Sequence, residues 1–131
     1  MTEVKQIDDE LYDVICGWWR DHGWPVLPKE LLPKHGYIVV LDGRPVIAGF
    51  LYKDVTASFG MIEWIVADPK STRDDRDKCF PSLIEKLLSS ATECGVKLLV
   101  TTAIHKSLIG RLEKSGFVID YDGITQLCKQ L

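Results

Sequence analysis

Residues 62–69 read Ile-Glu-Trp-Ile-Val-Ala-Asp-Pro, an apolar run that holds one carboxylate and ends at a proline. β-branched and aromatic residues in a run of this length predict a strand, which we place at residues 61–67. A polar, charged loop is predicted over residues 70–78. The helix predicted after this loop stops at Gly95, because apolar residues recur at helical spacing before that glycine. These residues are Leu83, Ile84, Leu87, Leu88 and Ala91.

Two further strands are predicted just before this unit. Residues 37–41 and 45–52 are rich in β-branched and aromatic side chains, and Asp42-Gly43 lies between them. An Asp-Gly pair between two such runs is a strong hairpin signal. The two runs and the strand at residues 61–67 therefore predict an antiparallel meander.

A helix is predicted near the N-terminus. Asp8 and Asp9 are suitable caps, and Gly23 fits the position just after the last turn, where a left-handed backbone is least costly for glycine. The apolar residues between them recur on one face; these are Leu11, Val14, Ile15 and Trp18. Three prolines follow within nine residues, so only one helical turn is predicted there, at residues 29–32.

On the C-terminal side we predict a strand at residues 97–102 and a short helix at residues 107–115. Two more strands, at residues 117–120 and 124–131, are predicted to pair across the Asp-Gly turn between them. The whole order predicts an α/β fold with a mixed, mainly antiparallel sheet flanked by helices. We expect a single domain over residues 1–131, because this length leaves little room for a second one.

Composition excludes several classes of protein. The chain is 46% hydrophobic and 27% charged with a net charge of −3, so a wholly disordered chain is excluded, and a broad field for nucleic acid or an anionic membrane is not expected. The four cysteines show no CxxC pair and no zinc spacing, so we expect reduced thiols and no metal. The start of the chain lacks the pattern of an export signal, and its apolar runs are too short to span a bilayer. A cytoplasmic location is the expectation.

The order of elements and several strings resemble the GNAT superfamily of acyl-CoA-dependent N-acetyltransferases. The resemblance runs from about Asp8 to Leu131 and is most specific at residues 62–69 with the following loop and helix. Residues 107–117, which end in Gly-Phe, are similar to a short helix of the family, and residues 124–131 are similar to its closing strand. The chain is also similar to short stand-alone members that phages often carry.

The resemblance implies acetyl-CoA as cosubstrate and an amine as acceptor, with direct attack on the thioester in a ternary complex. Two neighbouring strands would splay, and the backbone of Ile65, Val66 and Ala67 would pair with the pantetheine amides. Glu63 would be the general base, as a carboxylate among apolar residues has a plausible cause for a raised pKa; the alternative is an acid that faces solvent or a lysine. By alternation Glu63 shares a face with Ile65, and Trp64 points to the core.

The family's phosphate-binding loop normally reads Arg/Gln-x-x-Gly-x-Gly/Ala, whereas residues 69–81 contain no glycine. Either the helix begins earlier, near Asp74, or the loop takes another path. Side chains could replace the glycines by binding phosphate directly; the candidates are Arg73, Arg76 and Lys78, with Cys79 beside them at the helix start. The alternative is a solvated loop in which Asp74, Asp75 and Asp77 repel phosphate and stabilise the first turn of the helix.

Three further positions bear on the chemistry. The family's usual proton donor, a tyrosine, corresponds to Leu112, which cannot donate a proton. His105 aligns with a frequent asparagine and could bind pantetheine or act as an acid, or lie on the surface. Trp19 and Trp24 are candidates to line an acceptor pocket, whereas Trp18 shares the core face of its helix.

The sequence thus predicts an N-acetyltransferase whose acceptor amine belongs to a small molecule or a protein. The rival prediction is a GNAT-shaped binding or assembly module that has lost catalysis, favoured by the missing glycines and by Leu112. Nucleic-acid binding has only the basic residues between Arg73 and Lys78 in its favour. The sequence leaves the oligomeric state open, and a homodimer is one possibility.

Overall fold

Five strands form one sheet whose spatial order follows the chain, β1-β2-β3-β4-β5. The computed structural model describes all 131 residues. The strands are β1 (Thr2–Gln6), β2 (His35–Leu41), β3 (Arg44–Lys53), β4 (Phe59–Ala67) and β5 (Leu98–Thr101). The first four pair antiparallel, and β5 runs parallel to β4. The predicted mixed, mainly antiparallel sheet is confirmed.

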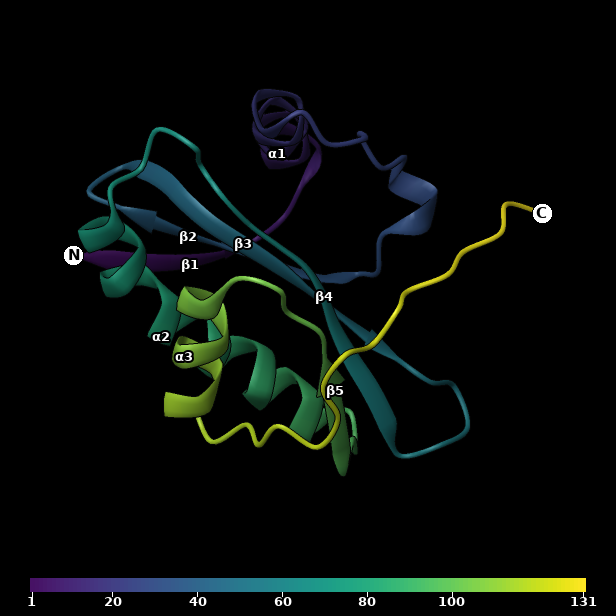
Figure 1. Cartoon of the computed structure of the whole chain (residues 1–131). Coiled ribbons are helices and arrows are strands. Elements are labelled where there is room, and N and C mark those ends of the chain that lie inside the picture. Colours follow the sequence, from purple (N-terminus) through teal and green to yellow (C-terminus); the bar gives the residue numbers. More distant parts are fainter.

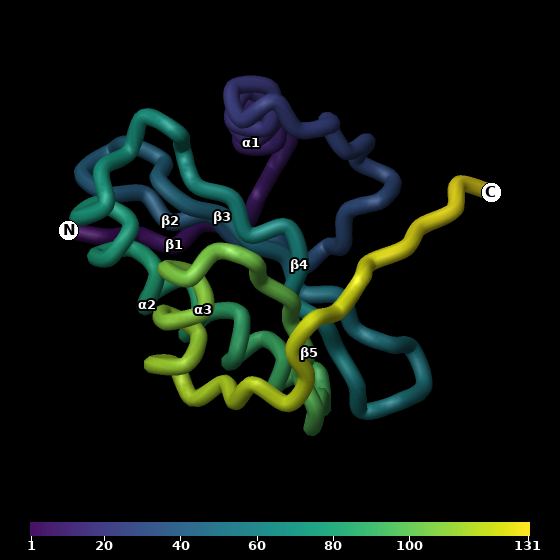
Figure 2. The backbone as a smooth tube through the Cα atoms, viewed as in Figure 1, coloured from purple at the N-terminus to yellow at the C-terminus, as the bar shows by residue number.

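Helices cover both faces of this sheet. Figure 1 shows α1 (Asp9–His22) on one face, with α2 (Arg73–Glu93) and α3 (Lys106–Lys114) on the other. A single 3-10 turn, η1 (Lys29–Leu31), follows α1, as the prolines predicted. The tube in Figure 2 shows how the chain passes from β4 to α2 and returns through β5. This crossover makes β4 and β5 parallel.

The N-terminal helix has the predicted ends. The Asp8 carboxylate accepts a hydrogen bond of 2.9 Å from the Leu11 N–H, and Gly23 takes a left-handed backbone with φ of 76°. Trp18 is buried, as its place on the core face predicted, and packs with Ile15 against the sheet. Burying each such large apolar side chain contributes roughly 1.5–3 kcal/mol.

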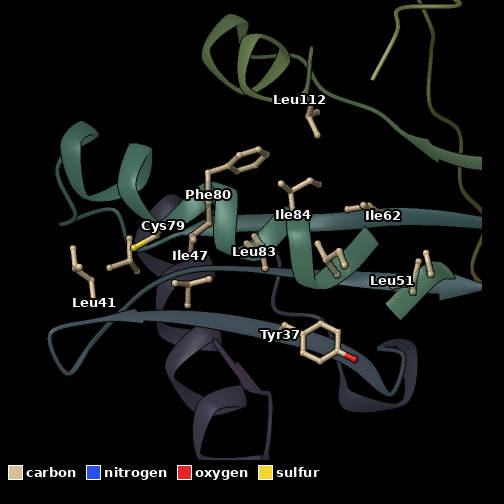
Figure 3. Close-up of a cluster of buried hydrophobic side chains, with 14 residues drawn as sticks. Tyr37, Leu41, Ile47, Leu51, Ile62, Cys79, Phe80, Leu83, Ile84 and Leu112 are labelled. Carbon is tan, nitrogen blue, oxygen red and sulfur yellow. The ribbon is translucent and has the colours of Figure 1, made fainter. Parts of the chain in front are cut away.

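The larger core cluster lies between the sheet and α2. Figure 3 shows Phe80, Leu83 and Ile84 of α2 in one cluster with Ile62 of β4, and Leu112 of α3 reaches the same cluster. Leu83 and Ile62 are wholly buried. This packing fixes α2 along β2 and β3, and it places the first turn of the helix beside the end of β4.

Three predictions near the chain ends and in the charged loop were wrong or incomplete. The chain begins with a strand, β1, where we predicted none; it is an edge strand in which Thr2 and Val4 are half-buried. Residues 70–78 are only partly a loop, because α2 begins at Arg73. The alternative that the helix begins early, near Asp74, is confirmed.

The two strands predicted at residues 117–120 and 124–131 do not form. Phe117 is tied by its N–H to the Leu112 carbonyl, and every residue after it is exposed. Ile124 is three residues from Leu127, so it would lie on the opposite face of a strand from Leu127 and Leu131, because side chains on one face repeat every two residues. A strand there would bury little and would have only the four-residue β5 as a neighbour.

None of the helices combines the length and the apolar character that crossing a lipid bilayer requires.

Candidate active site at the end of β4

The strands β4 and β5 part after a short ladder. β5 pairs with β4 only from Phe59 to Ile62, and the Thr101 hydroxyl donates a last hydrogen bond of 2.8 Å to the Ile62 carbonyl. β4 continues to Ala67 with no strand on that side. The predicted splay is confirmed, and it leaves an open strand edge of five residues.

The polar backbone groups on this open edge follow from the pairing with β3. The Asp68 N–H donates to the Val46 carbonyl at 2.8 Å, so the Ala67 carbonyl in the same trans peptide points away from β3. Antiparallel alternation then turns both backbone groups of Val66 toward β3. The open edge presents the Ile65 carbonyl and the Ala67 N–H and carbonyl. Val66 was predicted with them, but it offers a ligand no free backbone group.

A β-bulge re-aims the side chains of β4. The register between β3 and β4 shifts between Ala48 and Phe50, and Trp64 takes a positive φ of 59°. Glu63 lies opposite Phe50 and so faces α1, whereas Ile65 packs in the cluster on the α2 side. The predicted alternation, with Glu63 and Ile65 on one face, was therefore wrong. An extra residue in one strand of a pair breaks the two-residue period.

Glu63 is half-buried, and burial raises the pKa of its carboxyl above the ordinary value of 4.5. No hydrogen bond or ion pair to another side chain offsets this loss of solvation. A carboxylate with a raised pKa and free oxygen atoms is a better proton acceptor than an ordinary surface glutamate. The structure thus provides the cause of a raised pKa that the sequence suggested.

Beside Glu63, three groups form a chain of hydrogen bonds. The Trp64 indole N–H donates to the Tyr52 hydroxyl at 2.8 Å, and this hydroxyl donates to the Leu31 carbonyl at 2.7 Å. Trp64 was expected in the core but is 39% exposed, because the bulge turns it toward Tyr52. Burial raises the pKa of Tyr52, so its phenol stays protonated near neutral pH. This chain of bonds connects β4 to the η1 turn.

The C-terminal end of α1 reaches the open edge. His22 Nε2 donates to the Ala67 carbonyl at 3.0 Å, and the His22 ring stacks on Trp24 with centroids 4.2 Å apart. Trp24 is 44% exposed, which suits the predicted place on an acceptor pocket. Trp19 does not: only 2% of it is exposed, and it packs edge-on against Tyr12. The sequence reasoning missed His22, because its partner lies 45 residues away.

The charged side chains at the start of α2 already have partners, either one another or nearby backbone groups. Thr72 and Asp75 form a reciprocal capping box, with bonds of 3.0 and 3.2 Å, and Lys78 pairs with Asp74 at 3.0 Å. The Arg76 guanidinium donates to the Ser71 carbonyl at 2.6 Å and braces the turn before the helix. The prediction that acidic residues stabilise the first turn therefore fits the structure. Lys78 and Arg76, which we predicted to bind phosphate, therefore already have partners within the chain.

The prediction that Cys79 helps to bind the cofactor is also wrong. Cys79 is wholly buried on the core side of α2, and burial raises the pKa of its thiol. A side chain without exposed surface cannot contact a cofactor phosphate. Of the predicted set, Arg73 remains 80% exposed, with only a loose 4.0 Å contact to Asp77.

A groove of about 770 Å³ runs between α2 and α3. Four cationic side chains and two anionic ones lie along it, an excess of two positive charges; these are Arg73, Lys106, Arg111 and Lys114 against Asp77 and Glu85. Arg111 bridges the groove by donating to Asp77 at 2.8 and 3.0 Å, which lowers the pKa of that carboxyl. Sequence reasoning missed the basic residues of α3, although Arg111 and Lys114, three residues apart, lie on one helix face.

The last two predicted positions lie on either side of α3. His105 precedes the helix, is exposed, and makes no capping bond with its side chain. Leu112 is 4% exposed and belongs to the core cluster, so no proton donor occupies that place. No group of three or more His, Cys, Asp or Glu side chains gathers as a metal site would.

The mixed five-stranded sheet, with helices on both faces and with β4 and β5 parted at one end, has the architecture of one known fold. The chain has the GNAT acetyltransferase fold. A GNAT-family acetyltransferase from Streptococcus pneumoniae superposes with a TM-score of 0.68 at 17% identity, over 99% of this chain and 98% of that one. This superposition supports the GNAT fold and covers nearly the whole chain.

Two further GNAT-fold structures show how varied these neighbours are. A protein from Bacillus halodurans described as a transcriptional regulator gives a TM-score of 0.72 at 14% identity, over 98% of this chain and 100% of that one. N-acetylglutamate synthase from Neisseria gonorrhoeae, solved with coenzyme A and L-arginine, gives 0.68 at 15% identity, over 86% of this chain and 26% of that one. No family model and no curated protein sequence matches this chain.

Proposed function

We propose that the protein is an acetyl-CoA-dependent N-acetyltransferase that transfers the acetyl group to an amine by direct attack in a ternary complex. The observation that carries the proposal is the open edge of β4. There the Ile65 carbonyl and the Ala67 N–H point outward as an acceptor and a donor, the pair that an added amide chain requires. Pantetheine is such a chain, since it contains two amides.

The nucleotide end of the cofactor would lie toward α2 and α3. Part of the α2 N-terminus is taken by the Thr72–Asp75 capping box, so the phosphates depend on side chains as well as on backbone N–H groups. Arg73 supplies an exposed guanidinium beside the groove, and guanidinium groups bind phosphate in a bidentate way. Arg111 donates to Asp77 through Nε and Nη2, so it would contact a phosphate oxygen through Nη1. In this arrangement, cationic side chains take the place of the glycine-rich loop that residues 69–81 lack.

The acceptor would approach from the α1 side, where Glu63 faces. The amine must lose a proton to attack the thioester carbonyl, and the Glu63 carboxylate receives it directly or through water. The Ala67 N–H and the Ile65 carbonyl hold the amides of the thioester chain in place. Since Leu112 offers no proton, the departing thiolate takes one from solvent, or from His105 if the cofactor reaches it.

The side chains that reach β4 from its own bulge and from the end of α1 suggest the kind of acceptor. Trp64 and the stacked His22–Trp24 pair present aromatic faces, and Glu63 presents a carboxylate. Aromatic faces and carboxylates both favour a cationic amine. The proposal therefore takes a primary amine that is protonated in solution, on a small molecule or a protein, as the acceptor.

Thermal melting with and without acetyl-CoA tests cofactor binding. A ligand at about 100 times its Kd adds roughly 2.7 kcal/mol to the free energy of unfolding and raises the melting midpoint by several degrees. If acetyl-CoA gives that shift, release of the CoA thiol is measured across a panel of amines. Absence of any shift at saturating acetyl-CoA would contradict the proposal and favour a binding module with the same fold.

A further inference from the structure

A second cluster of reactive groups lies at the other end of α2, away from the open edge. Cys94 Sγ is 3.6 Å from His35 Nε2, and both side chains are half-buried, so solvent reaches them. The 21 residues of α2 separate Cys94 from the first helical turn at Arg73. At 1.5 Å per residue this is roughly 30 Å, so the cluster belongs to a different part of the surface.

The other nitrogen of the His35 ring is also engaged. His35 Nδ1 lies 3.4 Å from the Tyr37 hydroxyl, and that hydroxyl accepts a hydrogen bond of 2.9 Å from Ser90. Since Ser90 already donates to the Tyr37 oxygen, the Tyr37 proton is free to point at Nδ1. A neutral ring that accepts at Nδ1 carries its proton on Nε2, the atom that faces the sulfur.

An N–H group that faces a cysteine sulfur favours the thiolate over the thiol, because the negative sulfur is the stronger acceptor. The other features of the site act against the thiolate. Cys94 caps the C-terminal end of α2, where the helix dipole is negative, and it is partly buried. His35 is therefore the group on which the reactivity of this thiol depends.

We propose that Cys94 is a modification site whose thiolate, held by His35, exchanges with disulfides of small thiols. The Cys94 sulfur attacks one sulfur of the disulfide, the bond between the two ligand sulfurs breaks, and a mixed disulfide forms on Cys94. The released thiolate takes up the equivalent of the proton that Cys94 lost, so the exchange needs no further oxidant. The proposal stands independently of acetyl transfer.

The chain contains its own comparison thiol. Cys128 lies in the exposed tail and has no histidine beside it, whereas Cys16 and Cys79 are buried. The protein is incubated with oxidised glutathione at pH 7, and each cysteine is followed by peptide mass spectrometry. We expect Cys94 to be modified about tenfold faster than Cys128, because only Cys94 has an N–H group beside its sulfur. Faster modification of Cys128 would overturn the proposal.

The variant His35→Leu removes the N–H that faces the Cys94 sulfur and replaces the imidazole by an apolar side chain of similar size. We expect Cys94 in this variant to react more slowly than Cys128, while the matched variant Lys34→Gln, which removes a neighbouring charge, leaves the order unchanged. Unchanged reactivity of Cys94 in His35→Leu would overturn the proposal. Cys16 and Cys79 report on folding in the same samples, because their modification would show that the variant has opened; in that case the wild-type ratio of Cys94 to Cys128 decides.

Discussion

Glu63 is the residue on which the proposed chemistry depends, and its environment is set by two neighbours in the sheet. The bulge at Trp64 aims it toward α1, and Phe50 lies opposite it on β3. Burial beside these apolar groups raises its pKa, so the carboxylate forms over a higher pH range than in an exposed glutamate. The carboxylate is thus a stronger base than that of an exposed glutamate.

The substitution Glu63→Gln removes the proton acceptor without changing the size of the side chain. We expect kcat/KM for the acceptor amine to fall roughly 10²-fold. In the wild-type protein kcat/KM falls as pH drops through the raised Glu63 pKa, and this limb of the profile is absent in the variant. The matched substitution Glu30→Gln, of an exposed acid on η1, leaves both the rate and the profile unchanged. Equal profiles for the wild type and Glu63→Gln would remove Glu63 from the role of base.

The wild type and Glu63→Gln should also differ in how their free energy of unfolding depends on pH. The folded state binds the Glu63 proton more tightly than the unfolded state, since burial raises the folded pKa above 4.5. The wild type therefore loses stability as pH rises from the unfolded value through the folded one. Glu63→Gln escapes this loss, so its free energy of unfolding relative to wild type should increase across that window.

Individual residues show what could be predicted from the sequence at this scale. The Asp8 cap and the Gly23 stop depend on contacts within four residues, and both predictions are confirmed. The orientation of Trp64 depends on the register with β3, more than ten residues away, so the alternation rule failed there. The His35–Cys94 contact joins positions 59 residues apart, and no local pattern predicts it.

Among the elements, α2 begins with a capping box where the family would have glycines. Thr72→Ala removes the oxygen that accepts the Asp75 N–H, so we expect the free energy of unfolding to fall by about 1 kcal/mol. Urea denaturation measures the change. Thr92→Ala, at the exposed end of the same helix, serves as the control and should stay within about 0.5 kcal/mol of wild type. Equal losses in the two variants would show that the cap contributes nothing.

The groove between α2 and α3 makes a separate prediction. Arg111→Gln removes a guanidinium that lines it, so we expect the Kd for coenzyme A to rise about tenfold, in line with hydrogen bonds to charged groups of about 1.5–3 kcal/mol. The Kd for acetylpantetheine, which lacks the nucleotide, should not change. Calorimetry compares both ligands, with Lys53→Gln on β3 as the matched control. An equal effect of Arg111→Gln on the two ligands would contradict this placement of the nucleotide.

The elements also differ in how well the sequence predicts them. The meander from β2 to β4 carries strong β-rich runs and an Asp-Gly turn, and it was predicted within a few residues. β1 was missed, because its edge position allows polar residues at every second place. The early start of α2 was left open, because Thr72 and Asp75 are visible as a cap only once the helix is known to begin there.

For the molecule as a whole, the C-terminal tail separates from the body, as Figure 1 shows. Residues 118–131 make no hydrogen bond to the rest of the chain, and Val118 and Leu127 are more than 80% exposed. We expect deletion of residues 119–131 to change the melting midpoint by less than about 3 °C. Deletion of residues 111–131, which also removes buried Leu112, should lower it far more. A large loss from the shorter deletion would show that the tail packs in solution.

The central claim, that the open edge of β4 holds the pantetheine arm of coenzyme A, is tested most directly by amide NMR. The Ala67 N–H faces that edge, whereas the Val66 N–H is already bonded within the sheet. On titration with coenzyme A we expect the Ala67 resonance to shift to saturation and Val66 to move less, with parallel shifts around Arg111. An Ala67 resonance that stays fixed while coenzyme A binds elsewhere, or does not bind at all, would contradict the account.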